Sequence, residues 1–517
     1  MPSNNTRIVK NTLFLYFRML FTVVVGLYTS RVILQVLGIE DFGIYNVVGG
    51  VVMMFSFLNS GMVASSQRFI SYELGRKDIG RLKKVFSTSI SIHILLALLI
   101  FLLAETVGLW FLNARLNIAA ERMFAANWIY QCSILTFMLT VVNVPYNACI
   151  VAHEHMKTFA YISILEVFLK LVVVIVLPFL PFDKLIVYSS LVLLIALVVR
   201  LIYGIYCSYH FEECKYHLVR DKSLFTDMFS FAGWSFIGNL GFTAKAQGIN
   251  ILINLFFGTA VNAARGIAYQ ASSVIGGFMS TFQMALNPQI TKRYASGEIE
   301  SMIQLVSYGV KYSFFLLMII VIPFYIRAPY VLHLWLGIVP DYTVIFLRLV
   351  LIMLLIDSMA NPLVAAMQAT GRIRNFQLII SLIMLSNLPI SYIVLKSGGE
   401  PYSVMYVAIV TSLIGLIMRL QLLNALIPFD FWKFMRDILL RNVVVCVLAG
   451  IIPLYASQYI MNNFYGLLII VVFSLLVSFF VIYGVGLEKQ ERSFFVERLR
   501  LILRNRRICL LYTSDAA

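Results

Sequence analysis

Long, uninterrupted runs of apolar residues alternate with short polar connections along almost the whole chain. Most runs last about twenty residues or more, the length that a helix needs to cross a bilayer core of about 30 Å. They lack the alternation of polar and apolar positions expected of membrane-spanning strands. We therefore predict about fourteen transmembrane helices, at 11–37, 42–67, 85–110, 123–150, 158–180, 185–208, 230–257, 263–290, 303–326, 342–369, 377–395, 402–424, 440–460 and 464–486.

The composition leads to the same class. Hydrophobic residues make up 61% of the 517 positions and charged residues 12%, about half the charged share of an ordinary soluble protein. A soluble globule could not bury so much apolar surface, and disordered, collagen-like and disulfide-rich chains are excluded by the same numbers. The predicted fold class is an all-α polytopic membrane protein.

Lysine and arginine gather in alternate connections. Twenty-five of them lie at the ends and connections on one side of the predicted membrane, and five on the other. Because positive connections stay in the cytoplasm, we expect both termini there. This placement accounts for the formal charge of +16, and we expect no nucleic-acid partner. The first apolar run is too long for a cleavable signal peptide and should remain as the first span.

The sequence contains an internal repeat. The segment 142–159 aligns without gaps to 359–376, matching Pro145 with Pro362, and a weaker match pairs Gly38 with Gly258. Because six spans separate the copies, they share one topology, as in transporters built from parallel repeats. We predict two pseudo-symmetric six-helix lobes and two extra C-terminal helices. The expected segments are an N-terminal lobe (1–223), a C-terminal lobe (224–437), spans thirteen and fourteen (438–487), a basic amphipathic tail (488–507) and a non-native end (508–517).

Ten basic residues fall within or at the edges of spans, against three acids, Glu105, Glu166 and Asp357. An ion at mid-bilayer costs at least about 2.5–3.5 kcal/mol unless it is paired or hydrated. Such an excess of cations therefore predicts an aqueous cavity, an anionic ligand, or both. The ten are Arg18, Arg31, Arg68, Lys170, Arg200, Lys245, Arg265, Lys311, Arg348 and Arg419.

A purely structural role can explain the presence of several of these cations within the spans. Lys170 follows Glu166 by four residues, the order that favours an ion pair within one helix. Lys311, Arg348 and Asp357 could form a structural cluster between the ninth and tenth spans. Four others lie near span ends, where long side chains can reach the headgroups: Arg68, Arg200, Arg265 and Arg419.

Arg18, Arg31 and Lys245 have no acid close to them in sequence. Arg18 lies about 12 Å inside the first span and Lys245 near the middle of the seventh. We predict that these three line a cargo cavity. Arg18 and Arg31 could share it only if the first span bends, and Gly26 is a suitable position.

Five polar residues also recur along one face of the seventh span, opposite Lys245. Hydrogen bonding between helices would explain such a stripe, and so would binding of a sugar-like cargo. Lys245 shares its face with three glycines, so either the helix is distorted or only one face lines the cavity. The stripe consists of Asn239, Thr243, Gln247, Asn250 and Asn254.

Asn143 with Pro145, and Asn361 with Pro362, occupy matching places in the fourth and tenth spans. Proline frees a backbone carbonyl four residues earlier, so these helices could bend during transport or bind an ion. A passive kink is the alternative. Together with Asp357, these four residues are the candidates for coupling or gating.

The sequence lacks the motifs that are typical of several kinds of chemistry. The chain has no phosphate-binding loop of the GxxxxGK[ST] type, no arrangement typical of nucleophilic catalysis, and no outer loop longer than about fifteen residues. The six cysteines show no metal-ligand spacing and are expected in the apolar core, and His153 and His155 form only a weak cluster. We therefore expect neither an enzyme, nor a metal site, nor a cofactor.

The turn after the first span, Leu37-Gly38-Ile39-Glu40-Asp41-Phe42-Gly43-Ile44-Tyr45, resembles the LG-x-x-x-[FY]-G-x-[YW] turn of Wzx-like polysaccharide flippases. These belong to the multidrug/oligosaccharidyl-lipid/polysaccharide (MOP) exporter superfamily. The resemblance implies a MATE-like pair of lobes that opens alternately to each side of the bacterial inner membrane. Its cargo would be an undecaprenyl-diphosphate-linked oligosaccharide for O-antigen or capsule, and its partners membrane lipids and other polysaccharide-assembly proteins.

Drug-exporting relatives in this superfamily tend to carry ion-coupling acids in the N-terminal lobe. Here the first two spans offer Arg18, Arg31 and Arg68, and no acid before Glu40. This departure favours an anionic lipid as cargo. An ion-coupled exporter of small amphipathic compounds, motivated by Asp357, remains the alternative.

Overall fold

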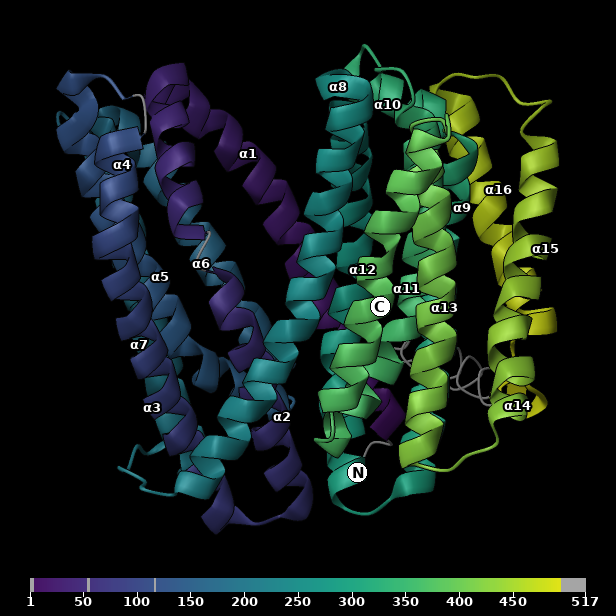
Figure 1. Ribbon diagram of the computed structural model, residues 1–517, viewed down its shortest axis with the longest axis horizontal. Helices are drawn as coiled ribbons and strands as arrows, with labels where there is room; N and C mark the ends of the chain where they lie inside the picture. Colours follow the sequence, from purple (N-terminus) through teal and green to yellow (C-terminus); the bar gives the residue numbers. More distant parts are fainter. Residues whose placement is uncertain (1–3, 54–55, 116–117, 494–517) are drawn as a thin grey trace, which may run out of the picture.

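The computed structural model describes residues 4–53, 56–115 and 118–493, without the side chains of 4–10 and of some positions elsewhere, several of them between 27 and 60. Within that part the chain is helical and contains no strand (Figure 1). Ten helical stretches among the described residues are long and apolar enough to cross a membrane, and Asn11–Gly26 is a shorter apolar helix. The predicted all-α polytopic class is confirmed.

The first repeat contains seven labelled helices, and the fourth of them extends the third. They are α1 (Asn4–Met53), α2 (Ser56–Arg76), α3 (Ile79–Leu103), α4 (Leu109–Arg115), α5 (Met123–Ala152), α6 (Met156–Val176) and α7 (Lys184–His210). A π-helical turn, Ala104–Gly108, joins α3 to α4.

The second repeat begins with a helix of 74 residues. Its helices are α8 (Lys222–Ala295), α9 (Ile299–Ile326), α10 (Ala328–Leu336), α11 (Thr343–Thr370), α12 (Arg374–Lys396) and α13 (Ser403–Leu426). The chain continues with α14 (Phe431–Phe434), α15 (Arg441–Ala456) and α16 (Phe464–Val481).

Two glycines divide the longest helices into separate spans. Gly38 in α1 has φ 78° and ψ 173°, and Gly258 in α8 has φ 80° and ψ −172°. A side chain would be strained at this backbone conformation, which is essentially restricted to glycine. The two residues that the repeat pairs therefore make the same bend, between spans one and two and between spans seven and eight.

The helices form two lobes, each with hydrophobic clusters of its own, and one cluster of the N-terminal lobe also includes residues of α8 such as Leu224 and Phe231. Two of the clusters of buried residues belong mainly to α1–α7. The largest extends from Ile249 to Ile470 and includes residues of α15 and α16. These two helices lie at the outer edge of the C-terminal lobe (Figure 1) and pack against α9. The fold is thus the expected pair of six-helix lobes with two additional helices.

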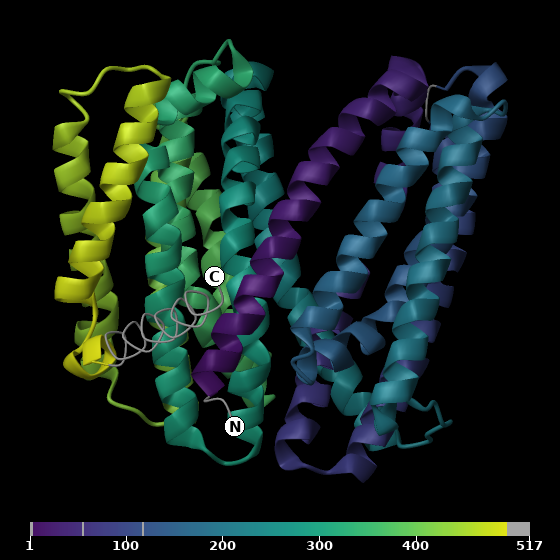
Figure 2. The ribbon, with the colours of Figure 1, turned by 180° about the vertical axis from the view of Figure 1, so that it is seen from behind.

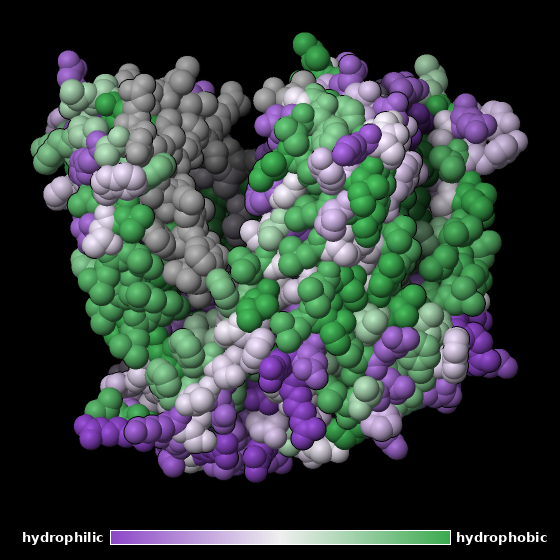
Figure 3. Space-filling model, viewed as in Figure 1, coloured by the Kyte–Doolittle hydropathy of each residue, from purple (hydrophilic) through white to green (hydrophobic). Residues whose placement is uncertain are grey.

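The lobes meet at one end, which carries the connections 75–84, 152–157, 291–301 and 370–376 and which we call the basic face. There the Glu154 carboxylate pairs with the Lys292 ammonium at 2.6 Å, and the Ser65 hydroxyl donates to the Met228 carbonyl at 2.9 Å. At the opposite end the lobes are separated by a hollow (Figure 3).

Two diagonal helices connect the lobes across this arrangement. The first half of α1 leans from the C-terminal lobe at the basic face to the N-terminal lobe at the opposite face (Figure 2). It packs on both α6 and α8. The first half of α8 leans the other way and borders the opening between the lobes (Figure 1). Each of the two repeats therefore contributes one helix that contacts both lobes.

Candidate substrate-binding site

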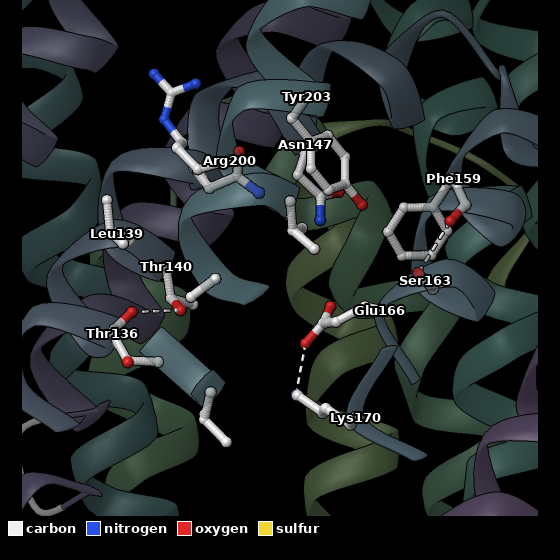
Figure 4. Close-up of a pocket in the computed structure, with 14 residues that line it drawn as sticks. Thr136, Leu139, Thr140, Asn147, Phe159, Ser163, Glu166, Lys170, Arg200 and Tyr203 are labelled. Carbon is white, nitrogen blue, oxygen red and sulfur yellow. Dashed lines mark hydrogen bonds and ion pairs between the residues drawn. The ribbon is translucent and has the colours of Figure 1, made fainter. Parts of the chain in front are cut away.

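A polar pocket of about 280 Å³ lies inside the N-terminal lobe, between α5, α6 and α7 (Figure 4). One face of α5 supplies four polar residues at spacings of four, three and four, which a helix places in one row. From α6 and α7 come charged and aromatic side chains. The polar lining consists of Thr136, Thr140, Asn143 and Asn147 from α5, Ser163, Glu166 and Lys170 from α6, and Arg200 and Tyr203 from α7.

The single acid of this pocket is already paired. The Lys170 ammonium donates to Glu166 Oε1 at 2.7 Å, as the spacing of four predicted, and the two side chains point toward each other in Figure 4. Both remain more than a third exposed. The pocket therefore presents no unpaired carboxylate.

Arg200 does not extend to the headgroups as expected. Its guanidinium lies 4.0 Å from the ring centre of Tyr146 and points away from Glu166 (Figure 4). It lines the pocket, which gives the pocket a second cation besides Lys170.

Arg18 approaches the same region from α1. Its guanidinium lies 4.8 Å from the ring centre of Phe159, which also lines the pocket. The Arg18 Nε is buried and has no hydrogen-bond partner. The cation is thus held against an aromatic ring rather than against an acid. The side chain of Arg31, the other cation predicted on this helix, lies outside the described residues.

The C-terminal lobe has a cationic cluster of its own. Lys245 is 6% exposed, and its ammonium lies 3.6 Å from the Met384 sulfur. Asp357 interacts electrostatically with Lys245 and Arg419, without an ion pair within 4 Å among the described contacts. With the buried Arg265 nearby, three cations surround one acid.

The polar stripe of α8 lies on the exposed side of the helix. Asn239, Thr243, Gln247 and Asn254 are exposed and Asn250 is half-buried. The Asn250 amide donates to Gln247 Oε1 at 3.1 Å, and the Arg265 guanidinium donates to Asn250 Oδ1. The stripe is therefore connected to a buried arginine of the cationic cluster.

The choice between a distorted and a straight seventh span is resolved. Between residues 222 and 257, α8 contains no non-helical residue. Its glycines allow close contact with α12: a Cβ at Gly238 would lie 2.0 Å from Gln377, and one at Gly241 would lie 2.9 Å from Ser381. Lys245 shares this packed face, so the ammonium does not lie on the exposed surface with the stripe.

The paired prolines do not interrupt their helices, since α5 and α11 continue through Pro145 and Pro362. Asn143 lines the N-terminal pocket, and its buried Oδ1 has no partner. Asn361 contacts only the Met279 sulfur, at 4.0 Å, among the contacts described for it. These positions are therefore packed inside their lobes.

The predicted cluster of Lys311, Arg348 and Asp357 does not form. Lys311 pairs with Glu491, which follows α16, and the Arg348 Nε donates to the Tyr325 carbonyl at 3.2 Å. Asp357 instead faces Lys245 and Arg419. The ninth and tenth spans are neighbours in sequence, but this does not indicate which faces of the two helices contact each other.

Three cysteines that looked scattered converge at the basic end of the N-terminal lobe. Cys149, Cys207 and Cys214 are all buried. Potential ligand atoms of Cys149, Glu213 and Cys214 lie within 4.8 Å of one another, and the His153 ring nitrogen lies 2.5 Å from the Glu213 carboxylate. Their burial agrees with the expected core role, but their clustering gave no signal in the sequence spacing.

Comparison with known proteins identifies the family. The family model for polysaccharide biosynthesis proteins matches residues 8–294, more than half of the chain. The chain belongs to the polysaccharide biosynthesis protein family. This confirms the resemblance drawn from the turn at Leu37–Tyr45. No curated protein matches the chain at a significant level.

Solved structures similar to this member of the family are transporters. An outward-facing multidrug-resistance MATE transporter of the MOP superfamily aligns with a TM-score of 0.72 and 15% identity, over 82% of this chain and 96% of that chain. A MOP-superfamily transporter from Pyrococcus furiosus, described as having a binding pocket of reversed polarity, aligns with a TM-score of 0.66 and 15% identity, over 82% and 96%. At these identities the likeness concerns the fold, which is that of a multi-pass membrane transporter.

The candidate site residues of this polysaccharide biosynthesis protein are distributed over both lobes. Arg18, Lys245, the stripe and Asn143 were named from the sequence, whereas Thr136, Thr140 and Asn147, which share the polar face of α5 with Asn143, were missed. Positions 136, 140, 143 and 147 repeat at helical spacing, so the signal was present. It was hidden because threonine and asparagine are common in membrane helices as interhelical hydrogen-bond partners.

Proposed function

We propose that this transporter flips an undecaprenyl-diphosphate-linked oligosaccharide from the inner to the outer leaflet of the bacterial inner membrane, for surface polysaccharide synthesis. The observation that carries the proposal is the excess of buried and half-buried cations over acidic residues in both lobes. Arg18 lies against Phe159, and Lys245 belongs to a cluster of three cations around Asp357. An anionic cargo would compensate this charge.

The exposed stripe of α8 supplies the second chemistry that such a cargo needs. Amide and hydroxyl groups of Asn239, Thr243 and Gln247 can donate to and accept from sugar hydroxyls. The apolar residues Leu240, Ile251 and Leu255 of the same helix are also exposed. A lipid-linked sugar has both a polar and an apolar part, so this mixed surface beside the opening suits it.

The orientation is part of the proposal. With the basic face in the cytoplasm, the hollow between the lobes opens outward, and the contacts around Glu154 and Lys292 close the inner side. Alternating access then requires that these contacts break when the cargo enters from the inner leaflet. Both chain ends would be cytoplasmic.

Complementation tests the proposal. In a strain that lacks the gene, wild-type protein should restore surface polysaccharide, and without it the lipid-linked intermediate should accumulate on the inner leaflet. If the deletion leaves surface polysaccharide intact and instead raises sensitivity to amphipathic cations, the protein is the ion-coupled exporter of small compounds that its MATE-like fold also suits.

A further inference from the structure

A second basic pocket lies between the lobes at the basic face, with a volume of about 430 Å³. Its walls come from the end of α2 and the start of α3, the start of α8 and the connection between α11 and α12. The charged residues that line it are Arg68, Arg76, Arg81, Arg372 and Arg374, with Glu73 and Asp227. Five arginines against two acids leave a local excess of positive charge.

Arg68 is the most enclosed of these arginines. Its guanidinium lies 4.5 Å from the ring centre of Phe69 and 4.7 Å from that of Tyr72, and its Nη2 donates to the Ala369 carbonyl at 3.3 Å. The Arg68 Nε is buried without a hydrogen-bond partner. No carboxylate of the described residues lies within ion-pair distance, so this half-buried cation is only attracted from further away, by Glu73 and Asp227.

The rim adds cations that are only partly neutralised. Arg81 pairs with Glu73 at 3.1 Å, whereas Arg374 lies 5.3 Å from the ring centre of Trp234. Among the described ion pairs, none involves Arg76, Arg372 or Arg374. The exposed guanidinium groups are therefore free to reorient toward a ligand.

This combination suits one chemical class of ligand. Guanidinium groups bind phosphate oxygens in a bidentate manner, and several arginines around one pocket match an anion with more than one charge. The arginines come from both repeats: Arg68, Arg76 and Arg81 belong to the N-terminal lobe, and Arg372 and Arg374 follow α11 of the C-terminal lobe. A bound anion would therefore bridge the lobes.

We propose that this pocket is a binding site for a diphosphate-type anion, separate from the hollow between the lobes, and that the bound anion stabilises the closed state of the basic face. The anion compensates Arg68 and links it to Arg372 and Arg374 across the seam. The proposal concerns the pocket alone and does not depend on which cargo is transported.

The purified full-length protein allows a direct test with inorganic pyrophosphate. Calorimetric titration should give saturable binding, and Trp234 fluorescence should change because Arg374 leaves its ring. The double variant Arg372→Ala/Arg374→Ala should bind at least about tenfold more weakly. Both side chains are exposed, so the variant should fold. Arg436→Ala is the matched control, since Arg436 is an exposed arginine that pairs with Asp437 outside the pocket.

A second titration distinguishes the source of the anion. Binding of farnesyl diphosphate about tenfold tighter than pyrophosphate would indicate a lipid diphosphate, and equal affinity would indicate a free anion. Either result supports the site if the double variant weakens it. Absence of saturable binding of both probes, or unchanged affinity in the double variant, would overturn the proposal. Neither result depends on whether the protein restores surface polysaccharide. Failure of the anion-site proposal would therefore leave the proposed flippase function standing, and the reverse also holds.

Discussion

The position of Arg18 against the Phe159 ring makes this residue the sharpest test of an anionic cargo. We expect Arg18→Ala to abolish export, because the variant removes a cation that no described acid neutralises. Arg18→Lys should restore export only in part, since an ammonium cannot bind two phosphate oxygens as a guanidinium does. The measurement is surface polysaccharide in the deletion strain, normalised to protein level in the membrane.

Arg436→Ala serves as the control for Arg18, because Arg436 is exposed and pairs with Asp437 away from both lobes' pockets. Arg200, which the sequence placed within reach of the headgroups, is unsuitable as a control because it lines the N-terminal pocket. Wild-type export by Arg18→Ala would contradict a role of this cation in cargo binding.

Lys245 requires a different design, because it is buried beside Asp357. Lys245→Ala should abolish export whether the ammonium compensates the cargo or only Asp357. The double variant Lys245→Met/Asp357→Asn removes both charges while keeping similar volumes. We expect it to reach wild-type levels in the membrane but to remain inactive. Recovery of export in the double variant would show that Lys245 serves only to neutralise Asp357.

Depth along a helix was sufficient to select two candidate residues, whose roles in cargo binding stay predictions. Arg18 and Lys245 were identified because they lie far from span ends and from acids in sequence. Arg200 was misjudged because distance from a span end does not indicate the direction of a side chain. Its attraction to Tyr146, at 4.0 Å, is a tertiary contact that the linear sequence does not contain.

At the scale of elements, the contact between α8 and α12 depends on small residues. A Cβ at Gly241 would lie 2.9 Å from the Ser381 Cβ, so a large side chain must push the helices apart. We expect Gly241→Leu to destabilise the protein by about 1–3 kcal/mol, as overpacking usually does. The measurement is the apparent melting temperature of the purified protein.

Gly233→Ala is the matched control on the same helix, because a Cβ there would meet no atom within 4 Å. It should leave the melting temperature unchanged or raise it slightly, since alanine favours a helix more than glycine does. Equal melting temperatures for Gly241→Leu and wild type would mean that the α8–α12 contact is not close-packed.

The hydropathy of the sequence located the helices, and the internal repeat paired the two glycines at which the longest helices bend. Span boundaries followed from the apolar runs, and pairing Gly38 with Gly258 matched two residues that adopt the same conformation. The roles of the two faces of the seventh span could not be decided in advance. In a straight helix with glycines on one face and amides on the other, either face could pack against a neighbouring helix. Only the position of α12 shows which face does.

At the scale of the whole molecule, the sequence predicted two lobes but not which end is open. Both states of an alternating transporter share one sequence, and their populations depend on small free-energy differences. Here the Glu154–Lys292 pair and the arginine pocket lie on the closed side. The proposed alternating access would have to rearrange these polar contacts in each cycle, together with apolar ones such as that between Phe69 and Phe231, whose ring centres lie 6.0 Å apart.

The driving force is a property of the whole molecule. A lipid-linked diphosphate carries about two negative charges, and moving each outward through about 100 mV, inside negative, is favourable by about 2.3 kcal/mol. The potential could therefore supply about 4–5 kcal/mol per cycle. An ion-coupled mechanism would need an available acid, but Glu166 in the N-terminal pocket is paired with Lys170, and Asp357 in the C-terminal lobe is attracted by Lys245 and Arg419. We expect flipping in proteoliposomes to follow an imposed potassium-diffusion potential and to be insensitive to sodium or proton gradients at zero potential. Flipping that depends on either gradient and persists without a potential would show that an acid such as Asp357 couples transport to an ion.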